Sequence, residues 1–431
     1  MSKFIIEGGH RLSGRVKTSG NKNSALKLLA ACTLTAEPVI LHNVPDIEDV
    51  RVMLQILEDI GVSVESLGDN SWRITAAKIH KTTVDPLLAG RIRASFVLSG
   101  PILARMGHIT LPFPGGDMIG GRPLDTHVEG LRALGAQTSL DHNNIFHVNA
   151  DPLVGGGYVL QAEASVTATE NTLMAATLAQ GETIIDNAAR EPHVEDLCRM
   201  LVQMGAQIEG AGTSRLFVQG VGSLHGTEFT VGSDFMEVGS FIGAAAVTGS
   251  EIRIENAEPH NLQMIRLVYE KLGVSWEVDG NDIIVPADQE MQIHHTVGGR
   301  VPEIKPAPWP GFPPDLMSIA VILATQCHGS VLLHDWMYES RFFFTDKLTF
   351  MGARIVLCDP HRVIVQGRSP LFANPNGVTS PDIRAGMAMV LAALCAQGTS
   401  TIHNIGQIDR GYENVEGKLA ALGANIKRVL E

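Results

Sequence analysis

The glycine-rich stretch from Pro114 to Asp125 contains two side chains that could do chemistry on an anionic substrate. Its four glycines give a backbone that can move and can approach a ligand closely. Arg122 can clamp a phosphate or a carboxylate through two parallel hydrogen bonds, and Asp117 can give or take a proton. Considered alone, the stretch could also be a surface turn with an exposed ion pair.

Charged side chains also stand where apolar segments of helical length begin. Lys22, Arg93 and Arg384 are cations at such starts, although the helix dipole favours acids there. Asp315 opens a further segment directly after two prolines. Conflicts of this kind tend to mark functional sites. Helix N-termini combined with Lys and Arg are typical of a pocket for phosphate and carboxylate.

Arg122 and three other arginines follow strand-like runs, namely Arg190, Arg341 and Arg410. Each alone could be a solvated or ion-paired surface residue. Because they recur at equivalent places of an internal repeat, they favour a shared anion-binding cleft.

A sixfold repeat is the element that must position these groups. A triplet of an apolar residue, glycine, and alanine or valine recurs after helix-like stretches, and its glycines are Gly61, Gly135, Gly205, Gly273, Gly352 and Gly423. The spacing of successive glycines runs from 68 residues (273 − 205) to 79 residues (352 − 273). Each glycine suits the left-handed cap of a helix and precedes a strand-like run.

Each repeat is predicted to comprise a buried helix, a strand, an amphipathic helix and two strands. The predicted buried helices are 23–35, 93–105, 168–179, 237–248, 315–326 and 383–396, which are apolar on most sides. Helices such as 47–60 and 415–422 mix charged and apolar residues and should be half exposed. The expected fold class is α/β, with three repeats in each of two domains.

Composition narrows the function classes. The chain has 431 residues, 18% of them charged, and a formal net charge of −13, which argues against nonspecific nucleic-acid binding. We expect no signal peptide and no membrane span, because no apolar run is long enough. Five cysteines without paired spacing predict a reducing cytoplasm, and the histidines form no metal-binding motif. We therefore expect no metal and no cofactor.

The sequence resembles the enolpyruvyl transferases that act on UDP-N-acetylglucosamine, and the resemblance covers essentially the whole chain. It is carried by SGNKN at 19–23, RAS at 93–95, the stretch 114–125, TEN at 169–171, NAAREP at 187–192, GFPPD at 311–315, SRF at 340–342, DIRA at 382–385 and IDRGYE at 408–413.

This resemblance implies a two-domain, inside-out α/β barrel fold in which sheets wrap buried parallel helices. It places the domains at 22–231 and at 1–21 with 232–431, and the active site between them. It also implies that phosphoenolpyruvate reacts with the 3-hydroxyl of UDP-N-acetylglucosamine and phosphate leaves, the first committed step of peptidoglycan synthesis. The oligomeric state stays open.

The resemblance assigns roles to individual residues. Asp315 would be the base at the hydroxyl, and Asp117 would transfer the proton at C3 of phosphoenolpyruvate. The expected phosphate contacts are Lys22, Arg122 and Arg410, and those of the substrate carboxylate are Arg341, Arg384 and Arg410. The expected sugar-nucleotide contacts are Asn23, Arg93, Arg122, Pro123, Leu124, Asp125, Thr126, Ser165, Val166 and Met337.

Three positions depart from the family pattern. Asp117 stands where most members carry cysteine, so we expect resistance to the epoxide antibiotic fosfomycin. Glu163 and Thr167 stand where lysine and glycine are usual near the nucleotide. The alternatives left open are a related transferase with another hydroxyl acceptor and a catalytically silent sugar-nucleotide-binding protein. The shikimate-pathway transferase and an RNA-end-processing protein fit less well.

Overall fold

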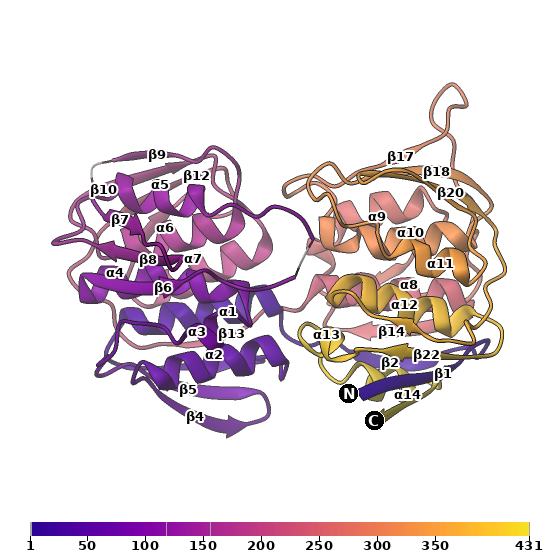
Figure 1. The fold of residues 1–431 in the computed structure, drawn as a ribbon, viewed down its shortest axis with the longest axis horizontal. Helices are drawn as coiled ribbons and strands as arrows, with labels where there is room; N and C mark the ends of the chain where they lie inside the picture. Colours follow the sequence, from indigo (N-terminus) through magenta and orange to yellow (C-terminus); the bar gives the residue numbers. More distant parts are fainter. Residues whose placement is uncertain (1, 118, 156, 431) are drawn as a thin grey trace. The chain divides into compact units, whose positions relative to one another are not determined.

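The computed structural model describes residues 2–117, 119–155 and 157–430. Met1, Met118, Gly156 and Glu431 lie outside the described residues. The chain divides into two compact units, shown in Figure 1. The N-terminal unit is Gly20–Asp117 with Arg122–Gly232, and the C-terminal unit is Met1–Ser19, Met118–Gly121 and Ser233–Glu431. The domain limits given above stay a prediction about which parts fold independently.

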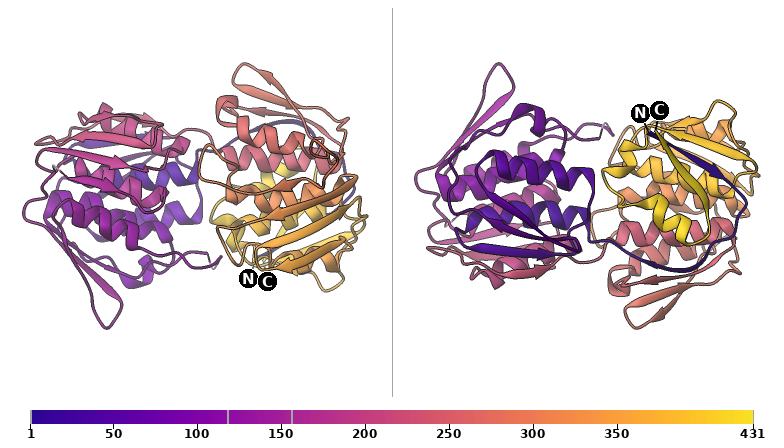
Figure 2. Two further views of the ribbon diagram at one scale, coloured as in Figure 1. Left: turned by 90° about the horizontal axis from the view of Figure 1, so that it is seen from above. Right: turned by 90° about the horizontal axis from the view of Figure 1, so that it is seen from below.

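Six apolar helices form the centres of the two units, and five of the six lie within a few residues of their predicted bounds. The N-terminal unit contains α1 (Lys22–Ala31), α4 (Ser99–Met106) and α6 (Val166–Ala176), and the C-terminal unit contains α8 (Phe235–Thr248), α10 (Met317–Gln326) and α12 (Ile383–Cys395). Nearly every side chain of α1 and α12 is buried. Within each unit the three central helices are surrounded by strands and outer helices (Figures 1 and 2).

The second predicted helix, 93–105, is wrong in detail. It begins as the 3₁₀ helix η2 (Arg93–Leu98) and becomes α-helical only from Ser99. Pro101 has no N–H to donate to the carbonyl of residue 97, so the regular α-helical ladder has a gap at this junction. The first helix likewise ends in the 3₁₀ turn η1 (Cys32–Leu34).

The outer helices are amphipathic, as predicted, and lie between the strands of each repeat. They are α2 (Glu48–Asp59), α5 (Asp125–Ala133), α7 (Pro192–Gln203), α9 (Gln263–Glu270), α11 (Thr345–Phe350) and α14 (Val415–Ala421). Shorter helical segments are α3 (Pro86–Ala89), η3 (Pro259–Asn261), η4 (Pro314–Leu316) and α13 (Gly406–Asp409). All six predicted cap glycines have φ between 72° and 104°, which confirms their left-handed conformation.

The described strands form six separate sheets, one for each repeat. The N-terminal unit contains three of these sheets. The first has the strand order β13 (Glu228–Thr230), β3 (Pro38–His42), β5 (Ser71–Thr75) and β4 (Ser63–Gly68), and the second has the order β6 (His108–Pro112), β8 (Ile145–Asn149) and β7 (Gln137–Leu140). The third has the order β11 (Gln207–Glu209), β12 (Arg215–Gln219), β10 (Glu182–Asp186) and β9 (Tyr158–Leu160). The C-terminal unit contains the other three sheets. The first has the strand order β15 (Glu277–Asp279), β16 (Asp282–Val285), β14 (Glu251–Glu255) and β2 (Ser13–Lys17), and the second has the order β17 (Glu303–Ile304), β18 (Gly329–His334), β20 (Arg362–Gly367) and β19 (Ile355–Asp359). The third has the order β21 (Val378–Thr379), β22 (Thr399–His403), β1 (Ser2–Glu7) and β23 (Asn425–Leu430).

Two strands pair in the sheet of a repeat other than the one that their position in the sequence suggests. Strand β2 precedes α1 in the chain but pairs in parallel with β14, with Gly14 opposite Ile252. Strand β13 precedes α8 but pairs in parallel with β3, with Phe229 opposite Leu41. Strand β1 lies between β22 and β23 and is antiparallel to both. The N-terminal residues therefore complete the sheets of the C-terminal unit.

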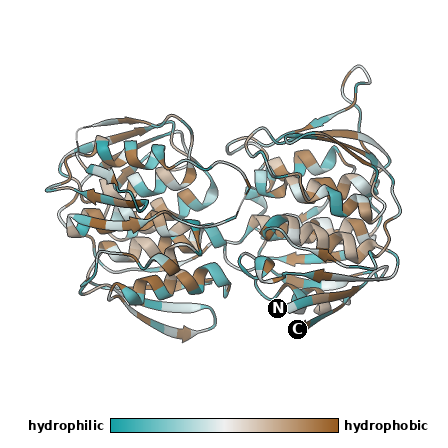
Figure 3. Ribbon diagram, in the orientation of Figure 1, coloured by the Kyte–Doolittle hydropathy of each residue, from teal (hydrophilic) through white to brown (hydrophobic). Residues whose placement is uncertain are grey.

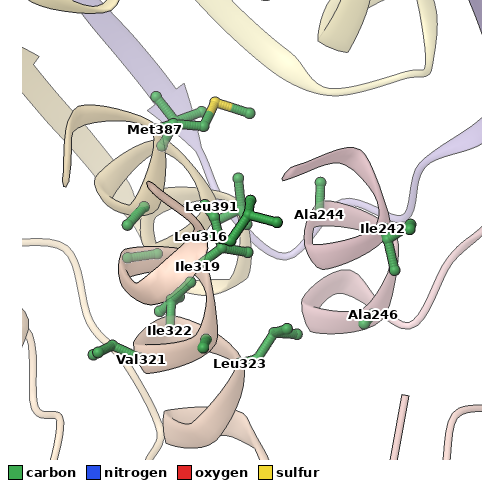
Figure 4. Close-up of a cluster of buried hydrophobic side chains, with 14 of the residues drawn as sticks. Ile242, Ala244, Ala246, Leu316, Ile319, Val321, Ile322, Leu323, Met387 and Leu391 are labelled. Carbon is green, nitrogen blue, oxygen red and sulfur yellow. The ribbon is translucent and has the colours of Figure 1, made fainter. Parts of the chain in front are cut away.

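The core of the C-terminal unit is built where the three central helices meet. Side chains of α8, α10 and α12 pack together in Figure 4, including Ile319 and Leu391. Gly243 of α8 allows this approach, because a Cβ there would lie 2.8 Å from Ile319 Cγ2 and 3.0 Å from Leu391 Cδ2. Figure 3 shows hydrophobic residues along the central helices and the strands of both units.

Candidate functional site

Lys22 lies at the first position of α1 and is held there by an acid. Asn21 caps the helix, and its Oδ1 accepts from the Ser24 N–H at 2.9 Å. Lys22 Nζ lies 2.7 Å from Asp49 Oδ2, and the two side chains are 10% and 6% exposed. The Asp49 charge offsets the unfavourable interaction between the cation and the helix dipole. Asn23, the next predicted contact, is half-buried.

A second buried ion pair joins α1 to α6. Lys27 Nζ lies 3.4 Å from Glu170 Oε2, and both side chains are almost fully buried. Burial raises the pKa of Glu170 to about 8 and lowers that of Lys27. The pair connects the two helices whose first turns carry Lys22 and Val166.

Arg93 fastens the C-terminal end of the glycine-rich stretch. Its guanidinium donates to the carbonyl oxygens of Arg122 and Pro123. At the other end, the Gly115 N–H donates to Ala89 O at 3.1 Å, and a Cβ on Gly115 would overlap the carbonyl of Gly90. These contacts give a physical reason for glycine at 115. Asp117 lies between the two anchored ends and is half-buried.

Helices α5 and α6 present the predicted nucleotide contacts of their first turns next to each other. His127 Nε2 donates to Thr167 Oγ1 at 3.0 Å, and its Nδ1 accepts from Asn171 Nδ2 at 3.1 Å. Burial lowers the pKa of His127 to about 3, so the ring is neutral and this tautomer is fixed. The bonds connect the segment of Asp125 and Thr126 to that of Ser165 and Val166.

Asp315 is held between two guanidiniums in the C-terminal unit. Arg341 Nη2 lies 3.2 Å from Asp315 Oδ1, and Arg384 Nε lies 2.9 Å from Asp315 Oδ2. The arginine side chains are 3% and 5% exposed, whereas that of Asp315 is 30% exposed. The sequence separations are 26 and 69 residues, so the fold brings these three predicted residues together.

The surroundings of Arg384 fix both its backbone and its guanidinium. Asp382 caps α12 by accepting from the N–H groups of Arg384 and Ala385, at 2.8 and 2.9 Å. The guanidinium carbon lies 5.3 Å from the centre of the Tyr412 ring, and the Tyr412 hydroxyl is 2.9 Å from Ser240 Oγ. Burial opposes the charge of Arg384, but the Tyr412 and Asp315 oxygens raise its pKa overall.

The remaining predicted residues of this unit are less tightly grouped. Arg410 follows α13, is half-buried, and donates to Gln407 Oε1 at 3.0 Å. Met337 lies in the turn after β18, where its N–H donates to Asp335 Oδ1 at 3.0 Å.

Sequence reasoning missed Asn21, Asp49, Asp335 and Tyr412 as supporting residues. Asp49 lies in the first turn of α2, where an acid needs no functional explanation. Asp335 and Tyr412 follow secondary-structure ends as ordinary polar residues. A usable signal was that both lie within a few residues of a predicted arginine, Arg341 or Arg410.

The predicted anion contacts fall into two sets, one in each unit. The C-terminal unit offers a carboxylate that can exchange a proton, next to buried guanidiniums that can bind a second carboxylate or a phosphate. In the described part of the chain, no group of His, Cys, Asp or Glu side chains is arranged to hold a metal ion. None of the described helices is both long and apolar enough to cross a membrane.

The family comparison agrees with this chemistry. The sequence model of the EPSP synthase (3-phosphoshikimate 1-carboxyvinyltransferase) family matches residues 6–419, so the chain belongs to this family of carboxyvinyltransferases. Within the family it groups with proteins named UDP-N-acetylglucosamine 1-carboxyvinyltransferase. It is 50% identical to that of Treponema denticola over 99% of both chains. It is 52% identical to that of Bradyrhizobium diazoefficiens over 100% of this chain and 98% of the relative.

Solved structures support the fold. The enolpyruvyl transferase NikO from Streptomyces tendae superposes with a TM-score of 0.88 at 24% identity and 99% coverage of both chains. EPSP synthase from Acinetobacter baumannii superposes with a TM-score of 0.74 at 20% identity and full coverage of both. The predicted two-part α/β architecture of the enolpyruvyl transferases is therefore confirmed.

Proposed function

We propose that this protein transfers the enolpyruvyl group of phosphoenolpyruvate to the 3-hydroxyl of UDP-N-acetylglucosamine and releases phosphate. The observation that carries the proposal is the Asp315 carboxylate between the buried Arg341 and Arg384 guanidiniums. Full-length identity of about 50% to proteins named for this transfer supports the choice of acceptor.

The reaction is an addition followed by an elimination. The hydroxyl oxygen bonds to C2 of phosphoenolpyruvate while Asp315 takes the hydroxyl proton and C3 gains a proton from Asp117. C3 then returns a proton, the carbon–carbon double bond forms again, and the C2–phosphate oxygen bond breaks. Asp117 and Asp315 act as acid and base, and Lys22 and Arg410 stabilise the phosphate as it leaves.

The cations divide between the two ends of phosphoenolpyruvate. Lys22, Arg122 and Arg410 bind its phosphate, whereas Arg341, Arg384 and Arg410 bind its carboxylate. Because Arg341 and Arg384 already donate to Asp315, a substrate carboxylate would share these donors with the base. This sharing would leave the Asp315 oxygens freer to accept the hydroxyl proton.

The sugar nucleotide is assigned to the first turns of the N-terminal unit. Contacts are proposed for Asn23, Arg93, Arg122, Pro123, Leu124, Asp125, Thr126, Ser165 and Val166, together with Met337 of the C-terminal unit. The bond between His127 and Thr167 supports this assignment, because it holds the starts of α5 and α6 next to each other. The N-terminus of α6, where the Ser165 side chain makes no capping hydrogen bond, suits a phosphate group.

A related reaction with another acceptor is the second candidate. Glu163 is an exposed acid two residues before Ser165, and its carbonyl accepts the Ser165 N–H. An acid there would repel a nucleotide phosphate, where the family pattern has lysine. A different nucleotide or sugar hydroxyl would relieve that conflict.

We also propose that the protein works in the cytoplasm in peptidoglycan synthesis, and therefore in cell-wall growth and division. Cys32, Cys198 and Cys327 are buried free thiols, which suits a reducing compartment. Its partners would be its two substrates, without nucleic acid, and the net charge of −13 supports that part of the proposal.

Phosphate release from phosphoenolpyruvate tests the proposal when the acceptor is varied. We expect release with UDP-N-acetylglucosamine and none with shikimate 3-phosphate, uridine monophosphate or free N-acetylglucosamine. Release with another member of the panel alone would establish the second candidate. Binding of the nucleotide with no release from any mixture would instead identify a silent relative.

A further inference from the structure

Asp335 is a fully buried carboxylate outside the set of residues assigned to the reaction. It directly follows β18 and is 0% exposed. Its backbone is fixed on both sides, because its N–H donates to His361 O at 2.8 Å and its carbonyl accepts from His361 Nδ1 at 2.7 Å. Burying a carboxylate costs free energy unless its oxygens accept hydrogen bonds or face a cation, so each oxygen of Asp335 should have such a partner.

The first oxygen of Asp335 shapes a turn. Its Oδ1 accepts from the N–H groups of Met337 and Tyr338, at 3.0 and 3.1 Å. A neutral amide oxygen in the same place could accept the same two hydrogen bonds. The turn therefore explains one oxygen and does not require a negative charge.

The second oxygen faces Arg341. Asp335 Oδ2 lies 3.6 Å from Arg341 Nε, and neither atom has a hydrogen-bond partner among the described residues. The other end of the same guanidinium contacts Asp315 through Nη2. Arg341 is therefore placed between a buried carboxylate behind it and a partly exposed carboxylate in front of it.

Arg341 is the charge that compensates the buried Asp335. Burial raises the pKa of Asp335 overall, and the Arg341 charge and the two backbone N–H groups offset part of that rise. Burial opposes the charge of Arg341, but Asp315, Asp382 and Asp335 together raise its pKa. When a substrate carboxylate competes for Arg341, Asp335 is the partner that stays.

We propose that Asp335 is a positioning residue that holds the Arg341 guanidinium in the orientation needed to bind the carboxylate of phosphoenolpyruvate. The proposal rests on the proposed function. It assigns the two oxygens different tasks: Oδ1 holds the Met337 turn, and Oδ2 holds Arg341. The two tasks can be separated by substitution.

Asp335→Asn tests the second task alone, because the amide keeps an acceptor for Met337 and Tyr338 while losing the charge toward Arg341. In the full-length protein we expect the KM for phosphoenolpyruvate to rise on the order of tenfold. The KM for UDP-N-acetylglucosamine should stay within about twofold, because the turn is preserved. Asp335→Ala removes both tasks and should raise both constants.

Asp141→Asn is the matched control. Asp141 Oδ1 also accepts two backbone N–H groups, from Asn143 and Ile145 at 2.8 and 3.0 Å, while its Oδ2 lies 3.4 Å from His147 Nε2. This variant should leave both constants unchanged. Equal rises of both constants in Asp335→Asn, or no rise for phosphoenolpyruvate, would overturn the proposal.

A measurement without turnover separates this inference from the proposed function. The Nε–H signal of Arg341 in arginine-labelled protein, assigned through Arg341→Lys, reports on the contact with Asp335 directly. We expect it to shift in Asp335→Asn and to stay in place in Asp141→Asn. An unchanged signal would contradict the contact even in an inactive protein, whereas a shifted signal without product from the wild-type protein would contradict only the proposed function.

Discussion

Asp315 is the residue whose side-chain chemistry can be tested most cleanly. Asp315→Asn preserves the shape between Arg341 and Arg384 but removes the proton acceptor. We expect kcat to fall by about two to four decades, with little change in the affinity for the sugar nucleotide. Steady-state kinetics and a nucleotide titration measure both quantities. A variant with near-normal turnover would refute the role of base.

We expect Asp117 to determine the response to an alkylating inhibitor. Fosfomycin blocks cysteine-bearing members of the family by alkylating a thiolate, and a carboxylate is a much poorer nucleophile toward an epoxide. We expect the wild-type protein to stay active during preincubation with fosfomycin, whereas Asp117→Cys should be active and lose activity with time. Asp117→Asn should lose most activity. Rapid inactivation of the wild-type protein would exclude resistance, and full activity of Asp117→Asn would exclude the acid role.

Single residues with unusual local chemistry were the most predictable part of the candidate site. Lys22 and Arg384 stood out because cations are disfavoured at helix starts, and the structure places acids near both. Asp315, the acid near Arg384, was itself a candidate, whereas the acid that supports Lys22 was not predictable, because Asp49 meets Lys22 only after a strand and a turn bring α1 and α2 together. The roles of all these residues in catalysis stay predictions.

At the scale of elements, the close packing of the central helices depends on Gly243. Gly243→Val should lower the free energy of unfolding by about 1–3 kcal/mol, because the new methyl groups would overlap Ile319 and Leu391. Urea unfolding followed by circular dichroism measures the change. Gly222→Val is the control, because open space surrounds that position. Equal stability of the two variants would show that the helices can move apart without cost.

The neutral His127 between α5 and α6 predicts a pH dependence of stability. Its folded pKa of about 3 lies below the ordinary value of 6.5, so the unfolded chain binds more protons between these values. Stability should therefore fall as pH drops below 6.5, by about 1 kcal/mol at pH 5.5 from this group alone. Urea midpoints at pH 7.5 and 5.5 test this, with His127→Asn as the comparison. An undiminished pH dependence in the variant would contradict a neutral His127.

The repeating elements were predictable because each depends on local chemistry. Apolar segments and cap glycines set the positions of α1, α6, α8, α10 and α12 within a few residues. The 3₁₀ start of the second central helix was missed, since a pattern of apolar residues does not distinguish a short 3₁₀ segment from an α-helical turn. The pairing of β2 with β14 and of β13 with β3 was also missed, because partners of such short strands are chosen by tertiary packing.

At the scale of the whole molecule, the order of substrate binding should be visible in the glycine-rich stretch. Amide hydrogen exchange in peptides covering 113–122 should slow when UDP-N-acetylglucosamine is added and change little with phosphoenolpyruvate alone. The four glycines leave this backbone able to reorder when the nucleotide binds. Equal protection by either ligand would contradict an ordered sequence of binding.

The proposed transfer forms one new carbon–oxygen bond, and proton NMR of the purified nucleotide product tests for this bond most directly. After incubation with phosphoenolpyruvate and UDP-N-acetylglucosamine, we predict a product with two vinyl protons and an ether at the 3-oxygen of the sugar. In deuterated water the vinyl position should take up deuterium, because C3 gains and loses a proton during addition and elimination. Unmodified nucleotide, or an ether at any other oxygen, would contradict the proposed function.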